Sequence, residues 1–219
     1  RLADDLDTLA AVRAAVGDRL ELMVDCNQGW RMPWDVRPAW DVDHAADVAR
    51  ELRALNVYWM EEPLHRGDYA GYAELRRRAG IRIAGGEMTR EPYEFDTLLA
   101  GDCLDVYQPD VVCSIGMEGL RRLAGRVAAA GHMFTPHTWG NGIGLAANLH
   151  LTAGAGNASF IEFPYDPPEW SITRRDFVLQ TPIEPDAQGW LVLDESPGLG
   201  LALDEDALRA TLASGSTWQ

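Results

Sequence analysis

The chain has 219 residues, enough for one sizeable domain or two small ones, and its hydrophobic content of 47% is ordinary for a packed core. Its formal net charge of −15 argues against nucleic acid or an anionic membrane surface as the main partner, although a bound cation would still allow an anionic small substrate. All 19 basic residues are arginine, which excludes a Schiff-base lysine, a P-loop lysine and a lysine general base within this chain.

Helical and strand-like patterns alternate along most of the sequence. A first helix is predicted over residues 4–16, and Gly17 ends it. Further helices are predicted over residues 43–55, 69–79, 91–99, 116–130 and 143–152. Short apolar runs typical of buried strands lie between and after them, at residues 20–25, 57–61, 81–85, 104–108, 132–136 and 159–163. A loop rich in Trp and Pro separates the first strand from the helix that follows it.

Every predicted strand carries an ionisable residue within two residues of its C-terminal end. These residues are Asp25, Glu61, Glu87, Asp110, His137 and Glu162. After a longer first interval they recur about every 25 residues, a spacing typical of βα units in a parallel sheet. Charged side chains are costly on buried strands, so their regular placement at strand ends indicates one shared site.

Two architectures place such groups at the carboxyl ends of parallel strands: an open doubly wound sheet and a (β/α)8 barrel. A site drawing on all six strand ends favours the barrel, although six strands do not close an eight-stranded one. The chain also begins at Arg1, without Met, inside a predicted helix. We therefore expect the C-terminal part of a longer protein.

Two parts are expected along the chain. Residues 1–170 form a partial (β/α) barrel that carries the metal and acid/base site, and residues 171–219 form a C-terminal segment packed on it or on another domain. In that segment, residues 177–180 and 188–194 predict a short strand–turn element, and residues 197–210 predict a final helix.

Three of the strand-end acids, Asp25, Glu61 and Glu87, lie on consecutive predicted strands, so their side chains should converge. Carboxylates in one pocket repel each other unless a cation lies among them, and an oxygen-only ligand set favours a hard ion such as Mg²⁺. Each acid alone could equally be a surface residue at a loop start. Glu62, beside Glu61, is either a solvated loop acid or a hydrogen-bond partner of metal-bound water.

Asp110 and His137 close the next two strands. An aspartate beside a histidine fixes the tautomer of the ring and raises its pKa, which makes a general acid or base. We expect the remaining histidines to be structural: His44, His65, His132 and His150. The glycine-rich loop after His137 departs from a phosphate-binding pattern, and a tight turn with close packing is the better interpretation.

The sixth strand end carries Glu162 within an apolar frame. Such a frame raises the pKa of a carboxyl group, which can then donate a hydrogen bond to a developing oxyanion. An ordinary acid at a strand end is the alternative.

The ordered set MVDCNQGW, YWMEEPL, IAGGE, YQPD, FTPH, FIEF and PGLGLALDEDAL resembles the enolase superfamily, in its mandelate racemase branch. The resemblance implies a (β/α)7β modified barrel, here strands three to eight, with the N-terminal capping domain and the first strands missing. Asp110, where related branches place a lysine, argues against the muconate-lactonising and dipeptide-epimerase branch. A base that such enzymes carry on the second strand lies outside this sequence.

The resemblance further implies roles for the residues found above. Asp25, Glu61 and Glu87 would hold Mg²⁺. Asp110 and His137 would form an acid/base dyad, Glu162 would be an electrophilic hydrogen-bond donor, and Asn27 would contact substrate.

The expected activity is abstraction of the proton α to a carboxylate, with Mg²⁺ as cofactor. Dehydration of an acid sugar to a 2-keto-3-deoxy acid is favoured, and a racemase or epimerase of a 2-hydroxy acid is the alternative. A barrel of this family with lost activity and an unrelated phosphate- or flavin-binding barrel are the remaining possibilities. We expect a small carboxylate substrate, no nucleic acid or membrane partner and a homo-oligomer. Reduced cysteines at Cys26, Cys103 and Cys113 suggest a cytoplasmic protein.

Overall fold

The computed structural model describes residues 2–36, 38–193 and 195–211. Helices and parallel strands alternate along it, as the sequence predicts. The helices of this part are α1 (Leu2–Val16), α2 (Val42–Ala54), α3 (Tyr69–Ala79), α4 (Pro92–Ala100), α5 (Gly116–Ala129) and α6 (Gly142–Ala155), with a short 3-10 turn η1 (Gly17–Arg19) after α1. The strands are β1 (Leu22–Asp25), β2 (Val57–Glu61), β3 (Arg82–Gly85), β4 (Val106–Tyr107) and β5 (Met133–Phe134).

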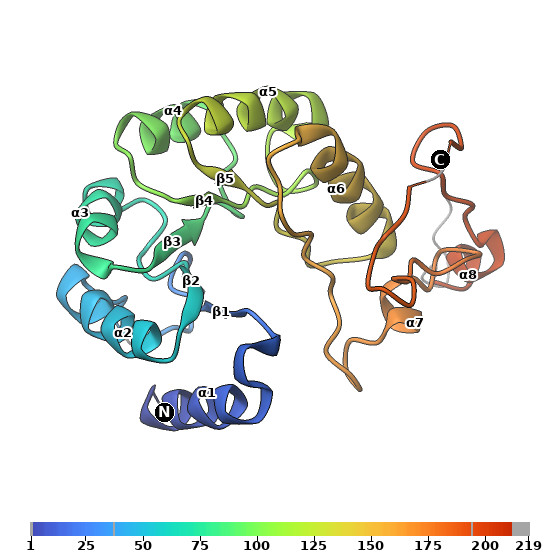
Figure 1. The fold of residues 1–219 in the computed structure, drawn as a ribbon. Coiled ribbons are helices and arrows are strands. Elements are labelled where there is room, and N and C mark those ends of the chain that lie inside the picture. Colours follow the sequence, from blue (N-terminus) through green and yellow to red (C-terminus); the bar gives the residue numbers. More distant parts are fainter. Residues whose placement is uncertain (1, 37, 194, 212–219) are drawn as a thin grey trace.

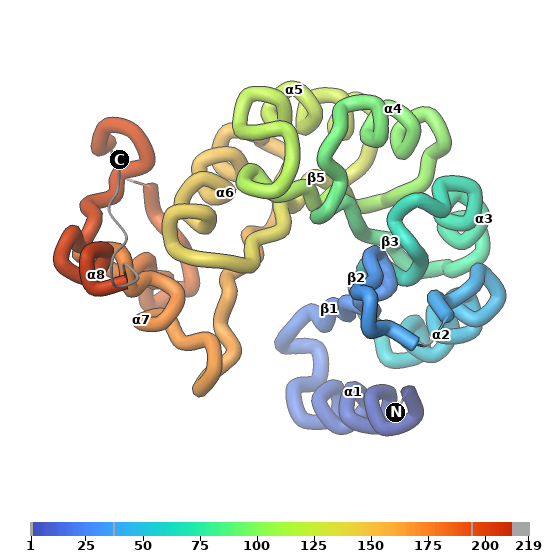
Figure 2. Tube along the Cα trace, turned by 180° about the vertical axis from the view of Figure 1, so that it is seen from behind, coloured from blue at the N-terminus to red at the C-terminus, as the bar shows by residue number. Residues whose placement is uncertain are grey.

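The sheet follows the chain order β1-β2-β3-β4-β5, and every neighbouring pair is parallel. A doubly wound sheet reverses its strand order at a switch point, whereas this order never reverses. The helices form an arc outside the strands, and the arc stays open between α1 and the C-terminal segment (Figures 1 and 2). The prediction of a partial barrel is therefore confirmed, and the open doubly wound sheet is excluded.

Local sequence explains where several helices begin and end. Asp41, Asp68 and Asn141 each accept a hydrogen bond from a backbone amide of the first helical turn that follows them. Gly80 ends α3 with a φ of 64°, a conformation that side chains rarely adopt. These capping residues fix the spacing between strands, and hence the positions of the strand ends.

Two apolar clusters lie on opposite faces of the sheet. The larger one packs the helices against the strands and includes the fully buried Leu75, Ile83 and Phe134. The smaller one, Trp59, Ala84 and Val106, lies on the inner face. Because strand side chains alternate, Trp59 and Glu61 share that inner face, so the inner cluster forms the floor beneath the acidic strand ends.

Residues 159–163 do not form the predicted sixth strand. They are assigned to neither a helix nor a strand. The preceding strand β5 is only two residues long, which leaves little backbone for another strand to pair with. Phe160 nevertheless contacts the rings of Tyr58 and Trp59, at centroid distances of 5.7 and 6.0 Å, so the segment still lies along the inner face.

The C-terminal segment differs from its prediction as well. It contains two short helices, α7 (Ile172–Arg175) and α8 (Glu205–Ala210), so only the end of the range 197–210 is helical. Gly198 and Gly200, with φ values of 71° and 68°, keep the earlier part of that range out of a helix. The strand–turn element predicted over residues 177–180 and 188–194 is wrong for the described residues, because neither stretch is a strand and Leu179 makes only an isolated bridge, to Leu203; residue 194 lies outside them.

Cys26 packs against the larger, outer cluster, as its position beside Asp25 on a strand predicts. Cys26, Cys103 and Cys113 are all free thiols. Among the described helices, none combines the length and apolar character needed to cross a membrane.

Candidate active site

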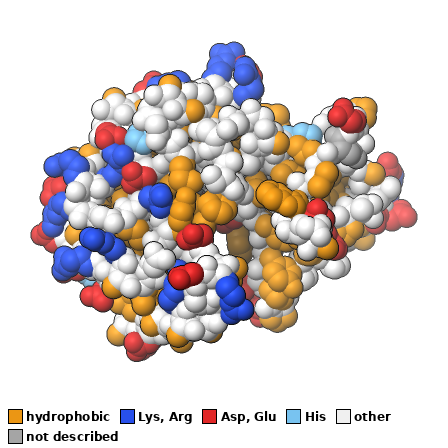
Figure 3. Space-filling view, in the orientation of Figure 1, with side chains coloured by type: hydrophobic (Ala, Val, Ile, Leu, Met, Phe, Trp, Pro, Cys, Tyr) orange, Lys and Arg blue, Asp and Glu red, His pale blue; other side chains and the backbone are white. Residues whose placement is uncertain are grey.

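Three predicted metal ligands lie at the carboxyl ends of neighbouring strands. Asp25 is the last residue of β1 and stands in register with Glu61, the last residue of β2. Glu87 follows β3 after Gly86, whose φ of 115° is open only to glycine and turns the chain at that point. Acidic side chains stand at the edge of a hollow near the middle of the face seen in Figure 3.

Each of these carboxylates is held by a different neighbour. Asp25 Oδ1 accepts a hydrogen bond from the Asn27 amide at 2.8 Å, and Glu61 Oε2 accepts one from Gln108 Nε2 at 2.7 Å. Glu87 Oε2 lies 3.2 Å from His137 Nε2. The three acids are thus oriented by groups from the loops and strands around them.

Burial and mutual repulsion raise the pKa values of the clustered acids, and His137 compensates their charge only in part. Burial raises the pKa of Glu61 to about 8, and the neighbouring charge of Asp25 adds to the shift. Burial likewise raises the pKa of Asp25 and of Glu87, although the positive charge of His137 opposes both shifts. A cation placed among these groups would remove the cause of the repulsion.

Glu62 belongs to the same cluster. It is 2% exposed, and its Oε2 atom has no hydrogen-bond partner among the described residues. Burial and the charges of Glu87 and Asp25 raise its pKa to about 8. A Cβ atom at Gly29 would overlap the Glu62 carboxylate, so a larger residue there would displace the acid.

The donor set of these acids suits Mg²⁺. Within the described part of the chain, no three His, Cys, Asp or Glu side chains are arranged to hold a metal ion as they stand. Asp25, Glu61 and Glu87 nevertheless offer only oxygen atoms, and the unpartnered Glu62 oxygen lies beside them. Such oxygen-rich, negatively charged sets favour a hard divalent cation.

Asp110 and His137 form the predicted dyad. His137 Nδ1 lies 2.9 Å from Asp110 Oδ2, while its other ring nitrogen faces Glu87. Burial alone would raise the pKa of Asp110, but hydrogen bonds from His137, Val112 and Asn148 outweigh it and the pKa is lowered. The aspartate is therefore ionised and holds the ring by its Nδ1 side.

His137 is buried among acids. Burial alone would lower its pKa, but the Asp110 hydrogen bond and the charges of Glu162 and Glu87 outweigh this effect and raise the pKa from 6.5 to about 9. The ring is consequently protonated at neutral pH in this cluster, and a cation among the acids would shift the balance towards the neutral base.

Glu162 faces the same space from the segment after β5. One of its carboxylate oxygens accepts a hydrogen bond from the Thr138 amide, next to the dyad histidine. Burial raises the pKa of Glu162, while His137 and the Thr138 amide lower it. The pKa remains raised, in the direction expected for a hydrogen-bond donor.

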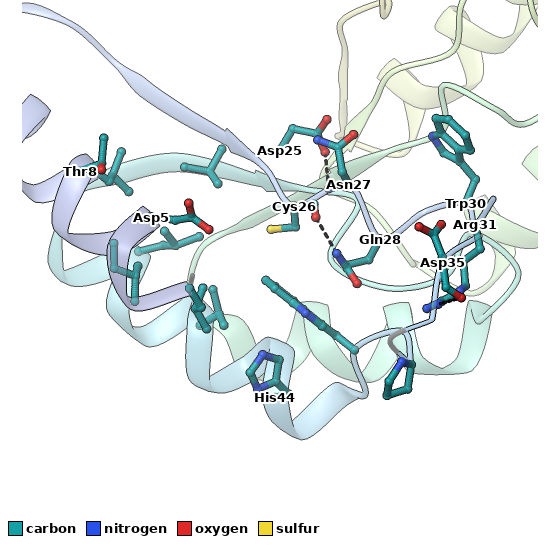
Figure 4. A pocket seen from close by; sticks show the side chains of 18 of the residues that line it. Asp5, Thr8, Asp25, Cys26, Asn27, Gln28, Trp30, Arg31, Asp35 and His44 are labelled. Carbon is teal, nitrogen blue, oxygen red and sulfur yellow. Dashed lines mark hydrogen bonds between the residues drawn. The ribbon is translucent and has the colours of Figure 1, made fainter. Parts of the chain in front are cut away.

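Asn27 lies beside the first metal-ligand candidate. It adopts a φ of 51°, and its side chain stands next to Asp25 at the end of β1 (Figure 4). Both residues line a cavity of about 980 Å³ that extends between α1, α2 and the Trp/Pro-rich loop. The position suits substrate contact, which stays a prediction.

Two further polar residues complete the site, and neither was predicted. Gln108 holds Glu61, and Asn148 of α6 donates to Asp110 Oδ1 at 3.2 Å. Strand alternation from Val106 could have placed Gln108 on the inner face. Asn148 offered one clue: it is an amide in the middle of a mostly apolar helix.

Two of the other histidines and the glycine-rich loop have structural roles. His44 packs on Trp40 with ring centroids 4.8 Å apart, and His132 Nε2 lies 3.1 Å from Asp102 Oδ1. Within the glycine-rich loop, a Cβ atom at Gly142 would collide with neighbouring side chains of the C-terminal segment. Close packing therefore explains this glycine, as the tight-turn interpretation predicts.

The comparisons with known proteins agree with this geometry. The sequence profile of the "Enolase C-terminal domain-like" family matches residues 1–207. The chain belongs to the enolase superfamily, in its mandelate racemase branch. It is 30% identical over 209 residues to D-galactarolactone cycloisomerase of Agrobacterium fabrum, which covers 94% of this chain and 52% of that relative.

Other members of the superfamily give the same picture. L-talarate/galactarate dehydratase of Salmonella typhimurium is 30% identical over 209 residues, covering 95% of this chain and 46% of that enzyme. A racemase from Streptomyces coelicolor, solved with bound magnesium, superposes with a TM-score of 0.77 at 27% identity, covering 96% of this chain and 52% of that one. The chain thus spans about half the length of the relatives it matches.

Proposed function

We propose that this chain carries the acid/base and metal-binding half of an enzyme that abstracts the proton α to a carboxylate. The observation that supports this most directly is the placement of His137, with Asp110 on one ring nitrogen at 2.9 Å and Glu87 of the acid cluster facing the other at 3.2 Å. A base held in this way points at whatever the acid cluster binds.

Each residue has a role in this proposal. Asp25, Glu61 and Glu87 would hold Mg²⁺, which supplies Lewis-acid stabilisation of negative charge on the substrate carboxylate. His137 Nε2 exchanges the proton with the substrate or with its leaving group, while Asp110 keeps the ring oriented. Glu162, with its raised pKa, donates a hydrogen bond to the oxyanion that develops.

The favoured substrate class is an acid sugar, dehydrated to a 2-keto-3-deoxy acid. A β-hydroxyl on the substrate would leave as water when His137 protonates it. The similarity to a galactarate dehydratase supports this class, whereas the similarity to a racemase supports the second candidate, return of the proton to the opposite face of a 2-hydroxy acid.

The test uses the full-length protein with Mg²⁺, galactarate, talarate and a wider panel of acid sugars in deuterated water. Formation of 2-keto-3-deoxy products supports dehydration, and deuterium at the α carbon without a new product supports racemisation. If no acid sugar of the panel gives a 2-keto-3-deoxy product or takes up deuterium at its α carbon, the proposal is contradicted.

Two variants then separate the dyad from the fold. His137→Asn should abolish turnover while Mg²⁺ binding, measured by calorimetry, persists. His132→Asn is the matched control, because that ring contacts Asp102 rather than the acid cluster. Near-full activity of the His137 variant would overturn the dyad assignment.

A further inference from the structure

Asn148 is a buried amide in a helix that is mostly apolar. It lies in the middle of α6, it is fully buried, and its helical neighbours Ala147 and Leu149 are buried as well. Asparagine is a poor residue for a helix interior, and burying its amide is costly unless both ends are hydrogen-bonded. Its side chain must therefore have partners outside the helix.

Both ends of the amide bond to the loop after β4. Asn148 Oδ1 accepts a hydrogen bond from the Val111 amide at 3.0 Å, and Nδ2 donates to Asp110 Oδ1 at 3.2 Å. The Val111 amide can only donate, so it fixes which end of the Asn148 side chain faces the aspartate. The Asn148 amide is thus hydrogen-bonded both to the Asp110 carboxylate and to the backbone of the following residue, Val111.

These two hydrogen bonds determine how the Asp110 carboxylate is oriented. Oδ2 is the oxygen that meets His137, and Oδ1 accepts from Asn148 and from the Val112 amide at 2.7 Å. The Val112 bond lies within the same loop and moves with it, whereas the Asn148 bond comes from another element. Asn148 therefore connects the Asp110 loop to α6, the helix that begins shortly after His137.

We propose that Asn148 is a positioning residue of the acid/base pair, which holds the Asp110 carboxylate in the orientation that faces His137 Nδ1. Its influence on turnover rests on the proposed function, but its influence on the pair itself does not. The test therefore needs a measurement that requires neither substrate nor metal.

That measurement is the exchange rate of the His137 ring Nδ1 proton, followed by NMR of the chain labelled at histidine nitrogen, with His137→Gln for assignment. Asn148→Asp keeps the acceptor for the Val111 amide but places an oxygen where the donor to Asp110 stood. We expect its His137 ring proton to exchange at least about tenfold faster than in the wild type, as fits loss of a hydrogen bond to a charged group.

Two controls separate this effect from general loosening of the fold. The His132 ring, bonded to Asp102, should give an unchanged signal in every folded variant. Leu151→Ala creates a cavity on the same helix, at a residue that is 3% exposed. It should destabilise the chain but leave the His137 exchange rate within about twofold of the wild-type rate. A faster His137 rate in this control would assign the effect to the helix and overturn the proposal.

If the Asp variant loses its His132 signal, it is unfolded. In that case Asn148→Ser, whose side chain is too short to reach Asp110, replaces it in the His137 exchange measurement. In the wild type, the Asn148 Nδ2 protons themselves should exchange slowly. Unchanged His137 exchange in the folded variants, or free exchange of the Asn148 amide, would overturn the proposal.

The full-length enzyme gives the second readout. With an acid sugar that it converts, Asn148→Asp should lower kcat about tenfold and leave KM within about twofold, because the amide acts on the base rather than on binding. If the wild type converts no acid sugar, the proposed function fails while the NMR result still stands or falls by itself.

Discussion

The buried ion pair of Arg175 and Asp176 offers a sharp test of how the last part of the chain is held. The Arg175 guanidinium is fully buried and binds both oxygens of Asp176, at 2.7 and 2.6 Å. It also donates to the Pro164 and Ile183 carbonyls, and it lies 4.2 Å from the centre of the Phe163 ring. The substitution Arg175→Met removes the guanidinium and keeps an unbranched apolar stem.

The magnitude follows from what the substitution leaves behind. Asp176 is 2% exposed, so it would become a buried charge without its cation. Removing one partner of a buried pair costs about 3–5 kcal/mol. Because about 1 kcal/mol shifts Tm by roughly 2–4 °C in a domain of this size, Tm should fall by about 6–20 °C.

The double variant Arg175→Met, Asp176→Leu removes both charges and should recover part of that loss, since apolar replacement of a whole buried pair is often nearly neutral. The assay is thermal unfolding followed by circular dichroism. Arg50→Met is the control: its pair with Asp47 is exposed, with side chains 67% and 65% accessible, and should change stability by less than about 1 kcal/mol. A Tm of Arg175→Met within about 3 °C of the wild type would show that Asp176 does not depend on the guanidinium for its burial.

Three further predictions concern the acid cluster and the C-terminal packing. The pKa of His137 is raised from 6.5 to about 9, so this group stabilises the folded chain fully below pH 6.5, and the stabilisation is lost as pH rises through about 9. The pKa of Glu61 is raised from 4.5 to about 8, so its stabilisation is likewise lost as pH rises, between about pH 4.5 and pH 8. Tm in a chelating buffer should therefore fall from pH 6 to pH 9; a constant or rising Tm would contradict this. Mg²⁺ at about a hundred times its Kd should add about 2.7 kcal/mol of stability, and Asp25→Asn should abolish that gain in a calorimetric titration. Gly142→Ala should cost about 1–3 kcal/mol in urea unfolding, because its Cβ would come within 2.6 Å of a Leu179 methyl group, whereas Gly125→Ala, with open space around it, should not destabilise the chain.

The alternation of helices and strands could be predicted because its determinants are local. Helix α3 (Tyr69–Ala79) and strand β2 (Val57–Glu61) begin and end at the predicted residues, since Asp68 caps the helix, Gly80 ends it, and the apolar run of the strand stops at its acid. The strand-end positions of the acids follow from the same local pattern. Their partners do not, because Gln108 reaches Glu61 across the inner face of the sheet.

The predictions that failed depend on what lies beside a segment rather than within it. Residues 159–163 have a strand-like composition, but a strand needs a neighbour with free backbone, and the two-residue β5 offers little. Leu179 likewise bridges Leu203, a residue distant in the sequence, and no pattern within residues 177–180 could indicate that partner.

Asn148 shows where sequence can point without identifying a partner. A polar residue in the middle of an apolar helix is costly unless it is bonded, so the sequence alone indicates that some group must meet it. Which group depends on the rotation of α6 and on the length of the loop after β4, and both are properties of the packed structure. The anomaly is therefore visible in the sequence, whereas its link to the Asp110 carboxylate appears only once the helix and the strand end are placed together.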